Sequence, residues 1–394
     1  MPGPLEGLRV ADFTQLAQGP FSTQILGDLG ADIIKIEPLK GDWMRHWSMA
    51  NTWVNGHGVS FLTLNRNKRS IAIDLKNEQG REAALRIIGA SDVLTENFRP
   101  GVMKRLGLDY EFLHEQFPEL VYVASTGWGS TGPYVTRPGQ DLLAQAVSGT
   151  SYLQGEEGGP PLATAVGVAD FTAGFHIVIA ALAGVFRKQQ SGQGQRIDVD
   201  LLSSMMHLYI QEYAVYLNGG GEPVRSNSGI PNAYLGAPYG YFQTADGYIA
   251  IPMNPINKVA ELIGVEGYEN VTETQVMDGR DAIRGDLAKG FLAKTTDEWL
   301  EILLAEDIWC AKVQNFSDAE NDPQIAENQM ILEWEHPEAG TVRTTGVPFR
   351  LTETPGGVFR PAPLLAEHTN TILADVAGYS EPEIEQLHAA GAVA

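Results

Sequence analysis

The first 200 residues alternate short apolar runs with segments of helical periodicity. The first three predicted elements are a strand at 8–13, a helix at 21–29 and a strand at 32–36. Further strands are expected at 70–75, 93–98, 120–125 and 196–199, and further helices at 78–88, 110–116 and 201–217. Strands that alternate with helices of about ten residues predict a mostly parallel α/β sheet.

A longer apolar stretch begins directly after Asp170 and continues to Phe186. It stops at a basic, glycine-rich exit, so the pattern predicts a long buried helix with Asp170 in its first turn. Its longest uninterrupted apolar part is shorter than the roughly 20 residues of a membrane span, so we expect a soluble protein. By position alone, Asp170 is either a helix cap or a functional carboxylate.

The pattern changes after residue 217. Gly219, Gly220 and Gly221 end the helix, and Pro, Gly and Asn dominate as far as Pro238, which indicates a domain junction. Downstream, a strand at 247–251 and helices at 256–262, 281–292 and 296–304 predict a smaller α+β domain. We therefore expect a large domain at 1–222 and 325–394, and a small domain at 223–324. Segment 38–65 lacks periodicity and carries three tryptophans, which suggests a packed loop.

Charge and cysteine content narrow the classes of function. The chain has 49 acidic against 27 basic residues, a formal charge of -22, which disfavours nucleic acid and anionic membranes as partners. Its single cysteine, Cys310, cannot form an internal disulfide and is expected to be a packing residue. No basic-plus-apolar leader precedes the first strand, so we expect a reducing location, the cytoplasm in preference to an organellar matrix. The histidines show no metal-binding spacing, and no metal is expected.

A glycine-rich segment, G-W-G-S-T-G at 127–132, fits the G-x-G-x-x-G dinucleotide spacing and follows a predicted strand. Pro133 and the polar residues after it do not open a helix, and no acidic residue closes a further strand about 20 residues on. We therefore expect these glycines to allow the backbone to approach another backbone or a ligand closely.

Basic residues gather around two predicted strands. They are Arg66, Lys68, Arg69 and Lys76 around one, and Arg99, Lys104 and Arg105 after the other. Segments beyond the ends of parallel strands converge on one edge of the sheet, where ligands usually bind. On an acidic protein this cluster indicates a phosphate site, and a solvated charged rim is the alternative reading.

Several longer segments are distinctive as a set. They are P-L-E-G-L-R-V-A-D-F-T, G-A-D-I-I-K-I-E-P, N-R-N-K-R-S-I-A-I-D-L-K, D-V-L-T-E-N-F-R-P-G-V-M-K-R-L-G-L-D-Y, G-W-G-S-T-G-P, G-V-A-D-F-T-A-G, G-Q-G-Q-R-I-D-V-D-L-L-S-S and P-A-P-L-L-A-E-H-T. Together they resemble the family III CoA-transferases, the family of formyl-CoA transferase and carnitine CoA-transferase. The resemblance is almost continuous through Ser204 and returns in the last third of the chain.

The resemblance implies a Rossmann-like large domain, a small α+β domain and an interlocked homodimer. It implies acyl-CoA and a small carboxylic acid as substrates, with coenzyme A arriving as a thioester and no tightly bound cofactor. Asp170 matches the family's catalytic aspartate, and Asp141 matches an acid that orients or protonates groups near the thioester. The positions that match CoA contacts are Leu16, Ala17, Gln18, Lys76, Asn97, Phe98 and Arg105.

The implied reaction is CoA transfer through an aspartyl-CoA thioester. Helix-start N–H groups and glycines would stabilise the oxyanion, which favours an enclosed site near Gly167 and Gly174. Two departures from formyl-CoA transferase suggest other substrates than formate or oxalate: Ala17 stands in place of a glutamine, and the glycine-rich loop of the small domain has no close copy. Segment 227–241 is expected to form part of the wall for the acceptor acid.

A racemase is the alternative activity. The α-methylacyl-CoA racemases share the implied fold and pair the aspartate with a histidine, and the matching position here is Gln140. Glutamine cannot act as a base near neutral pH, so the sequence favours transfer over racemisation.

Overall fold

The computed structural model describes residues 3–394, which form two compact units. The first comprises the chain up to Ala144, Gly167–Met205 and Pro323–Ala394, and the second comprises Gln145–Val166 and Met206–Asp322. Residues 145–166 and 206–222, which were expected in the large domain, thus group with the second unit. The reason is visible in their contacts: the Arg225 guanidinium donates to the carbonyl oxygens of Gln154 at 2.9 Å and Pro160 at 2.8 Å.

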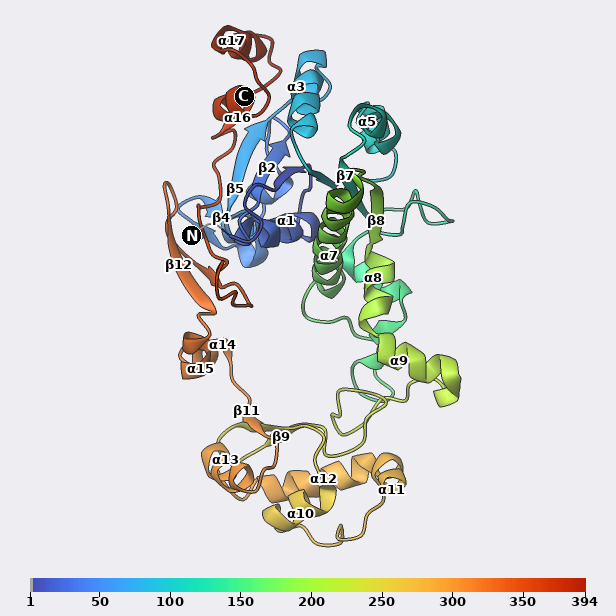
Figure 1. Ribbon diagram of the computed structural model, residues 1–394. Helices are drawn as coiled ribbons and strands as arrows, with labels where there is room; N and C mark the ends of the chain where they lie inside the picture. The colour runs from blue at the N-terminus through green and yellow to red at the C-terminus, as the bar shows by residue number, and fades with distance from the viewer. Residues whose placement is uncertain (1–2) are drawn as a thin grey trace. The chain divides into compact units, whose positions relative to one another are not determined.

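The first unit is built on a six-stranded parallel sheet, drawn in blue to green in Figure 1, with the order β5-β2-β1-β6-β7-β8. Its strands are β1 (Arg9–Asp12), β2 (Asp32–Glu37), β5 (Lys68–Ala72), β6 (Val93–Glu96), β7 (Val121–Thr126) and β8 (Arg196–Asp200). In the centre, Val10 of β1 pairs with Ile33 on one side and Val93 on the other. The α/β fold predicted from the alternation of strands and helices is confirmed.

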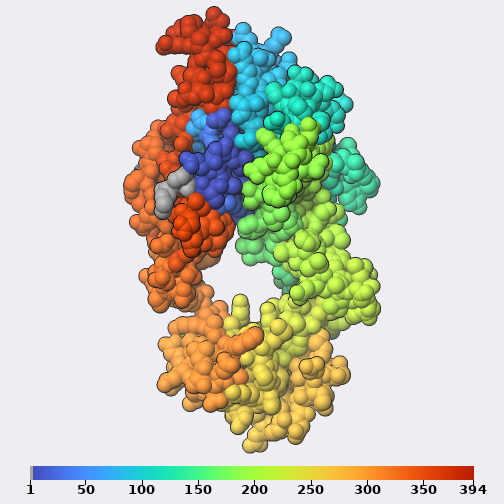
Figure 2. Space-filling view, viewed as in Figure 1, coloured from blue at the N-terminus to red at the C-terminus, as the bar shows by residue number. Residues whose placement is uncertain are grey.

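Helices cover both faces of this sheet. Helices α1 (Gln18–Asp28) and α7 (Val168–Ser191) pack on one face, and α3 (Glu78–Gly89) and α5 (Tyr110–Gln116) lie on the other. Two C-terminal helices, α16 (Thr369–Asp375) and α17 (Glu381–Ala389), join α3 there, as the red and light-blue segments in Figures 1 and 2 show. Helix α17, which was not predicted, begins with a capping box between Ser380 and Glu383.

Small residues let α7 lie close to its neighbours. A Cβ atom on Gly174 would be 2.7 Å from the Phe21 ring of α1, and one on Gly184 would be 2.5 Å from Val121 of β7. The helix has 24 residues and ends at Gly192, whose φ is 68°. By length and composition alone α7 could cross a membrane, but its contacts with α1 and the sheet are those of a helix in an α/β core.

Segment 38–65 is more ordered than the predicted loop. It contains two short 3₁₀ turns, a small hairpin of β3 (Trp53–Val54) and β4 (His57–Gly58), and α2 (Val59–Leu64). Met44 and Phe61 are buried against Val342 of a second hairpin, formed by β12 (Ile331–His336) and β13 (Gly340–Thr345). The remaining helices that contribute to this unit are α4 (Val102–Arg105), α6 (Asp141–Val147), α8 (Leu201–Leu208) and α15 (Pro323–Glu327), and the unit boundary falls within α6 and α8.

The second unit has its own core. An antiparallel sheet of β9 (Gly240–Gln243), β10 (Tyr248–Ile251) and β11 (Ala311–Lys312) packs against α10 (Ile256–Ile263), α12 (Arg280–Phe291) and α13 (Thr296–Ala305). The indole of Trp299 is buried there and donates to the Phe291 carbonyl at 2.7 Å, and Cys310 packs against the same core as expected. The other helices are α9 (Ile210–Val215), α11 (Glu273–Asp278) and α14 (Phe316–Glu320).

Candidate active site

A cavity of about 140 Å³ lies where β1, β6 and β7 end and α7 begins. This is the edge of a parallel sheet at which ligands usually bind. Its small volume suits the reacting end of a ligand, and a larger molecule would extend beyond it. The residues that line it are Leu16, Ala17, Gln18, Asn97, Phe98, Arg99, Pro100, Ser125, Thr126, Gly127, Trp128, Gly129, Val135, Arg137, Gly139, Gln140, Asp170 and Leu201.

The turn after β1 forms one wall. Its backbone is held by the Asn97 side chain, which donates to the Gln15 carbonyl at 2.8 Å and accepts from the Gln15 N–H at 2.9 Å. Leu16, next in the chain, has a φ of 68°, a left-handed conformation that this pair of hydrogen bonds helps to fix. The Asn97 amide is therefore occupied in shaping the turn, and Leu16, Ala17 and Gln18 present the cavity surface.

Three of the basic residues in the predicted phosphate cluster form ion pairs with carboxylates of the same chain. Arg66 pairs with Asp28 at 2.7 Å, Lys68 with Asp12 at 3.1 Å and Arg69 with Asp32 at 2.6 Å. The three residues lie at or just before the start of β5, away from the carboxyl ends of the strands. A charged side chain that is taken out of water needs a counter-charge, which these carboxylates provide. Burial lowers the pKa of Lys68 to about 8. The phosphate-site prediction is therefore wrong for these three residues.

Lys76 and Arg105 remain exposed, as expected of phosphate contacts, but neither lines the cavity. Lys76 follows β5, the edge strand, which lies three strand spacings or roughly 14 Å from β6. Arg105 is in the last turn of α4, beyond the end of β6. Arg99, which the resemblance did not assign as a contact, lies in the cavity wall.

Asp141 provides the cap of α7. Its Oδ1 accepts hydrogen bonds from the N–H groups of Ala169 at 2.7 Å and Asp170 at 3.1 Å. Gly167 stands at the N-cap position and Asp170 is the third helical residue, so the reading of Asp170 as a cap is wrong. The Asp170 side chain lines the cavity.

The environment of Asp170 favours the neutral acid. Burial raises the pKa of this carboxyl from an ordinary 3.8 to about 7, and the neighbouring Asp141 adds to the shift. A Cβ atom on Gly167 would lie 3.7 Å from Asp141 Oδ1 and 3.8 Å from Asp170 Oδ2, so both carboxyl groups flank this glycine. A poorly solvated carboxylate of this kind, beside a cavity, is a candidate nucleophile or base.

Of two further predicted site residues, Gln140 and Gly174, only Gln140 lines the cavity. Gln140 lines the cavity, and its Oε1 accepts from the Leu142 N–H at 2.9 Å. Gly174 lies one turn beyond Asp170 and packs against α1, so it contributes to helix packing and not to the cavity surface.

Several cavity residues, among them Ser125 and Trp128, were not predicted from the sequence. The Gln18 amide donates to the Ser125 hydroxyl at the end of β7, and the Trp128 indole donates to the Pro138 carbonyl at 3.1 Å. The close approach expected of the G-W-G-S-T-G glycines is confirmed, because a Cβ atom on Gly127 would be 2.4 Å from Gly139 Cα. Trp128 lies within that motif, so its position in the sequence could have indicated an aromatic residue in the cavity wall.

Glu96, also unassigned from sequence, lies buried at the end of β6. Its Oε2 accepts from the Phe98 N–H at 2.8 Å, and its Oε1 accepts from the Tyr122 hydroxyl at 3.3 Å. Burial raises the pKa of Glu96 to about 7. Through the Phe98 N–H, Glu96 holds the backbone of the cavity wall. In the sequence, the only sign of this role was an acidic residue at the end of a buried strand.

Comparisons with known proteins show the family to which the chain belongs. The model of CoA-transferase family III matches residues 5–369. Human succinyl-CoA:glutarate CoA-transferase is 34% identical over 99% of this chain and 90% of its own length, and formyl-CoA:oxalate CoA-transferase of Rhodopseudomonas palustris is 32% identical over 99% and 97%. The crystal structure of a CAIB/BAIF family protein from Brucella suis, 31% identical, superposes with a TM-score of 0.84 over 95% of this chain and 100% of that chain. The chain belongs to the family III CoA-transferases.

Proposed function

We propose that the protein is an acyl-CoA:carboxylate CoA-transferase that moves CoA from a donor thioester to an acceptor carboxylic acid through an aspartyl-CoA thioester on Asp170. The observation that carries the proposal is the state of this carboxyl group. It borders the cavity at the strand ends, it is poorly solvated, and Asp141 performs the capping task that would otherwise occupy it. Two chemically similar acids at one helix start therefore have separate tasks.

Each proposed step exchanges one bond at a carbonyl carbon. The Asp170 carboxylate attacks the donor thioester, the C–S bond breaks, and a mixed anhydride and the CoA thiolate result. The thiolate then attacks the Asp170 carbonyl, which releases the donor acid and leaves the aspartyl-CoA thioester. The acceptor carboxylate attacks that thioester, which breaks the C–S bond, expels the CoA thiolate and gives a second anhydride. The thiolate then attacks the acceptor-derived carbonyl to form the product acyl-CoA, and the Asp170 carboxylate leaves.

The raised pKa of Asp170 suits this role. Only the ionised carboxylate attacks a carbonyl, and a pKa of about 7 leaves a substantial ionised fraction at neutral pH. The same burial removes water from around the oxygens, which leaves the anion less solvated and hence more nucleophilic, and keeps water from the anhydride.

Asp141 acts in this proposal as a positioning residue. It holds the first turn of α7, and it accepts two of the N–H groups that were expected to stabilise an oxyanion. A third, that of Phe171, donates to the Gly167 carbonyl at 3.0 Å. The helix start thus orients Asp170 and leaves few free N–H groups that could bind an oxyanion. Side-chain and backbone donors of the opposite cavity wall are therefore the better candidates for stabilising it.

CoA binding is proposed at the walls around Asp170. The surface formed by Leu16, Ala17, Gln18 and Phe98 would contact the pantetheine arm, and Asn97 would act by holding the turn. Lys76 and Arg105 would meet the phosphates outside the cavity. Coenzyme A enters as a thioester substrate in this scheme.

Racemisation is not favoured. The relatives described above are CoA-transferases, and Gln140 borders the cavity at the position where the racemases carry a base. A second proton acceptor is needed to exchange an α-proton between two faces, and an amide cannot serve.

The proposal includes a homodimer, interlocked as the family resemblance implies. Its structural support is an apolar stripe on α7 formed by Phe175, Ile179 and Phe186, which are 49%, 63% and 62% exposed. At 100° per residue these three side chains fall within about 40° of one another, on the face away from the sheet. A second copy of the chain is the occupant that we propose for this stripe. We also propose a cytoplasmic location, which cell fractionation would test.

A substrate screen tests the proposed activity. Pairs of acyl-CoA donors and carboxylic acids, with succinate, glutarate, formate and oxalate as first members, would be incubated with the enzyme and examined for new thioesters by mass spectrometry. We expect a new thioester only when an acceptor acid is present, and no deuterium incorporation at the α-carbon of the donor in heavy water. Deuterium exchange without an acceptor would support a racemase and overturn the proposal.

A further inference from the structure

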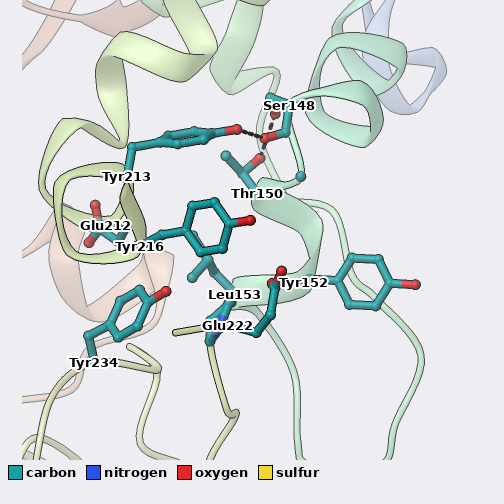
Figure 3. Close-up of a pocket in the computed structure, with 11 residues that line it drawn as sticks. Ser148, Thr150, Tyr152, Leu153, Glu212, Tyr213, Tyr216, Glu222 and Tyr234 are labelled. Carbon is teal, nitrogen blue, oxygen red and sulfur yellow. Dashed lines mark hydrogen bonds between the residues drawn. The ribbon is translucent and has the colours of Figure 1, made fainter. Parts of the chain in front are cut away.

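The second unit contains a cavity of about 270 Å³ that none of the preceding chemistry uses. Its walls come from two segments of that unit, the turn at Ser148–Leu153 and the chain that runs from α9 to Tyr234 (Figure 3). The volume is roughly nine times the share of one water molecule in the liquid, so the cavity suits a small molecule. It lies just below the usual range of about 300 to 1,000 Å³ for ligand pockets.

Aromatic and acidic side chains dominate its lining. Tyr213, Tyr216 and Tyr234 gather on one side of the cavity, and the carboxylates of Glu212 and Glu222 lie among them (Figure 3). No lysine, arginine or histidine is present among the lining residues that the structure describes. The lining therefore carries two carboxylates, whose charge opposes phosphates and carboxylates as occupants.

The hydroxyl groups are arranged as acceptors. Tyr213 donates its proton to the Ser148 carbonyl, and Tyr234 donates to the Gly221 carbonyl at 3.0 Å, so the lone pairs of both phenol oxygens remain. Burial and the nearby Glu222 raise the pKa of Tyr234, which keeps this phenol protonated. The cavity thus offers hydrogen-bond acceptors, aromatic faces and negative charge.

Glu212 and Glu222 differ in what they can offer. Glu212 Oε1 accepts from the Asn232 amide at 2.9 Å, which fixes that carboxylate in the wall. For Glu222 we find no hydrogen bond or ion pair within residues 3–394, and its charge acts on Tyr234. An unpaired carboxylate beside aromatic rings is the arrangement that a positively charged guest would complete.

We infer that this cavity binds a small organic ammonium ion. The carboxylate of Glu222 supplies the counter-charge, the tyrosine rings supply cation–π contacts, and the phenol oxygens accept hydrogen bonds from any N–H group of the guest. Primary and quaternary ammonium ions share the charge and differ in hydrogen bonding, so they distinguish the two contributions. The site is independent of the proposed transferase activity.

Isothermal titration calorimetry of the full chain at low ionic strength tests the inference. The probes are tetramethylammonium, ethylammonium, the neutral molecule tert-butanol and the anion acetate. We expect one or both ammonium ions to bind, and tert-butanol and acetate to bind at least tenfold more weakly. Binding of tetramethylammonium alone assigns the affinity to the aromatic faces, whereas binding of ethylammonium alone assigns it to the acceptor oxygens.

Two variants locate the binding. Glu222→Gln and Tyr216→Leu change exposed side chains, and each should weaken ammonium binding roughly three- to thirtyfold. Glu301→Gln and Tyr248→Leu are the matched controls, since both residues are exposed in the same unit outside this cavity. The inference is overturned if neither ammonium ion binds, if tert-butanol or acetate binds as tightly, or if Glu222→Gln leaves the affinity unchanged.

Discussion

Asp141 holds the backbone of the turn that carries Asp170 and raises the pKa of the Asp170 carboxyl group at the same time. Its Oδ1 accepts from the Ala169 N–H at 2.7 Å and from the Asp170 N–H at 3.1 Å, and its charge opposes ionisation of Asp170. Position and acidity of the proposed nucleophile therefore depend on one neighbouring side chain, which makes the two effects separable by substitution.

Asp141→Asn should keep the cap and remove the charge. The Asn oxygen still accepts both N–H groups, while loss of the charge lets the pKa of Asp170 fall from about 7. Burial, the larger cause, is unchanged. Because only the ionised carboxylate attacks, the acidic limb of kcat/KM against pH should move to lower pH. An unmoved limb would contradict the proposed electrostatic role.

Asp141→Ala is the matched control for that experiment. It removes the charge and the cap together, so we expect the same direction of shift in the pH profile. It should also lower the free energy of unfolding by about 1 kcal/mol, the usual cost of losing a helix cap. Equal stability of the Asn and Ala variants would show that the two hydrogen bonds contribute nothing.

Asp170→Asn should stabilise the fold at neutral pH. The folded-state pKa of about 7 exceeds the ordinary 3.8, so the folded protein binds more protons and loses stability as pH rises between these values. Removing the carboxyl group abolishes that loss, with a gain of up to about 4 kcal/mol above pH 7 and none near pH 4. Chemical denaturation at both pH values measures it, and a stability difference that does not change with pH would contradict the raised pKa.

The exposed bases Lys76 and Arg105 should affect CoA binding and leave the chemical step unchanged. Lys76→Gln and Arg105→Gln should each raise KM for the acyl-CoA roughly two- to fivefold at low salt, with kcat preserved and the effect smaller at high salt. Lys289→Gln, an exposed lysine of the second unit, is the control. A fall in kcat at constant KM would place these residues in the chemistry instead.

The apolar stripe on α7 should hold two copies of the chain together. Ile179→Lys inserts a charge into the proposed contact, so light scattering after size exclusion should report a lower mass than the wild type. Phe316→Lys is the control, because Phe316 is 97% exposed on α14 and lies outside the stripe. A wild-type protein that is monomeric at micromolar concentration would refute the homodimer.

The main elements of the sheet were predictable from sequence because most strands contain a short apolar run and helices such as α3 have a clear period. Helix α5 has the predicted bounds, and β1, β2 and β7 differ by one or two residues at their ends. Helix α17 was missed because its pattern is weakly apolar. The start of α7 and the place of Asp170 in it followed from the apolar run and the glycines around it.

The task of Asp141 was not predictable from sequence. It lies 29 residues before Asp170 in a short helix, and only the fold brings its oxygen to the backbone of α7. The ion pairs of Arg66, Lys68 and Arg69 were misread for the same reason, since their carboxylate partners lie on other strands and helices. Sequence spacing reports neighbours along an element, and these contacts cross between elements.

Trapping the covalent intermediate tests directly whether Asp170 carries CoA during turnover. The enzyme would be incubated with a donor acyl-CoA and an acceptor acid, treated with hydroxylamine or borohydride during turnover, digested and analysed by mass spectrometry. We expect a modification on Asp170 that requires the donor and is absent from Asp170→Ala, together with loss of CoA exchange in that variant. Full exchange activity in Asp170→Ala, with no modified Asp170 in the wild type, would contradict this expectation.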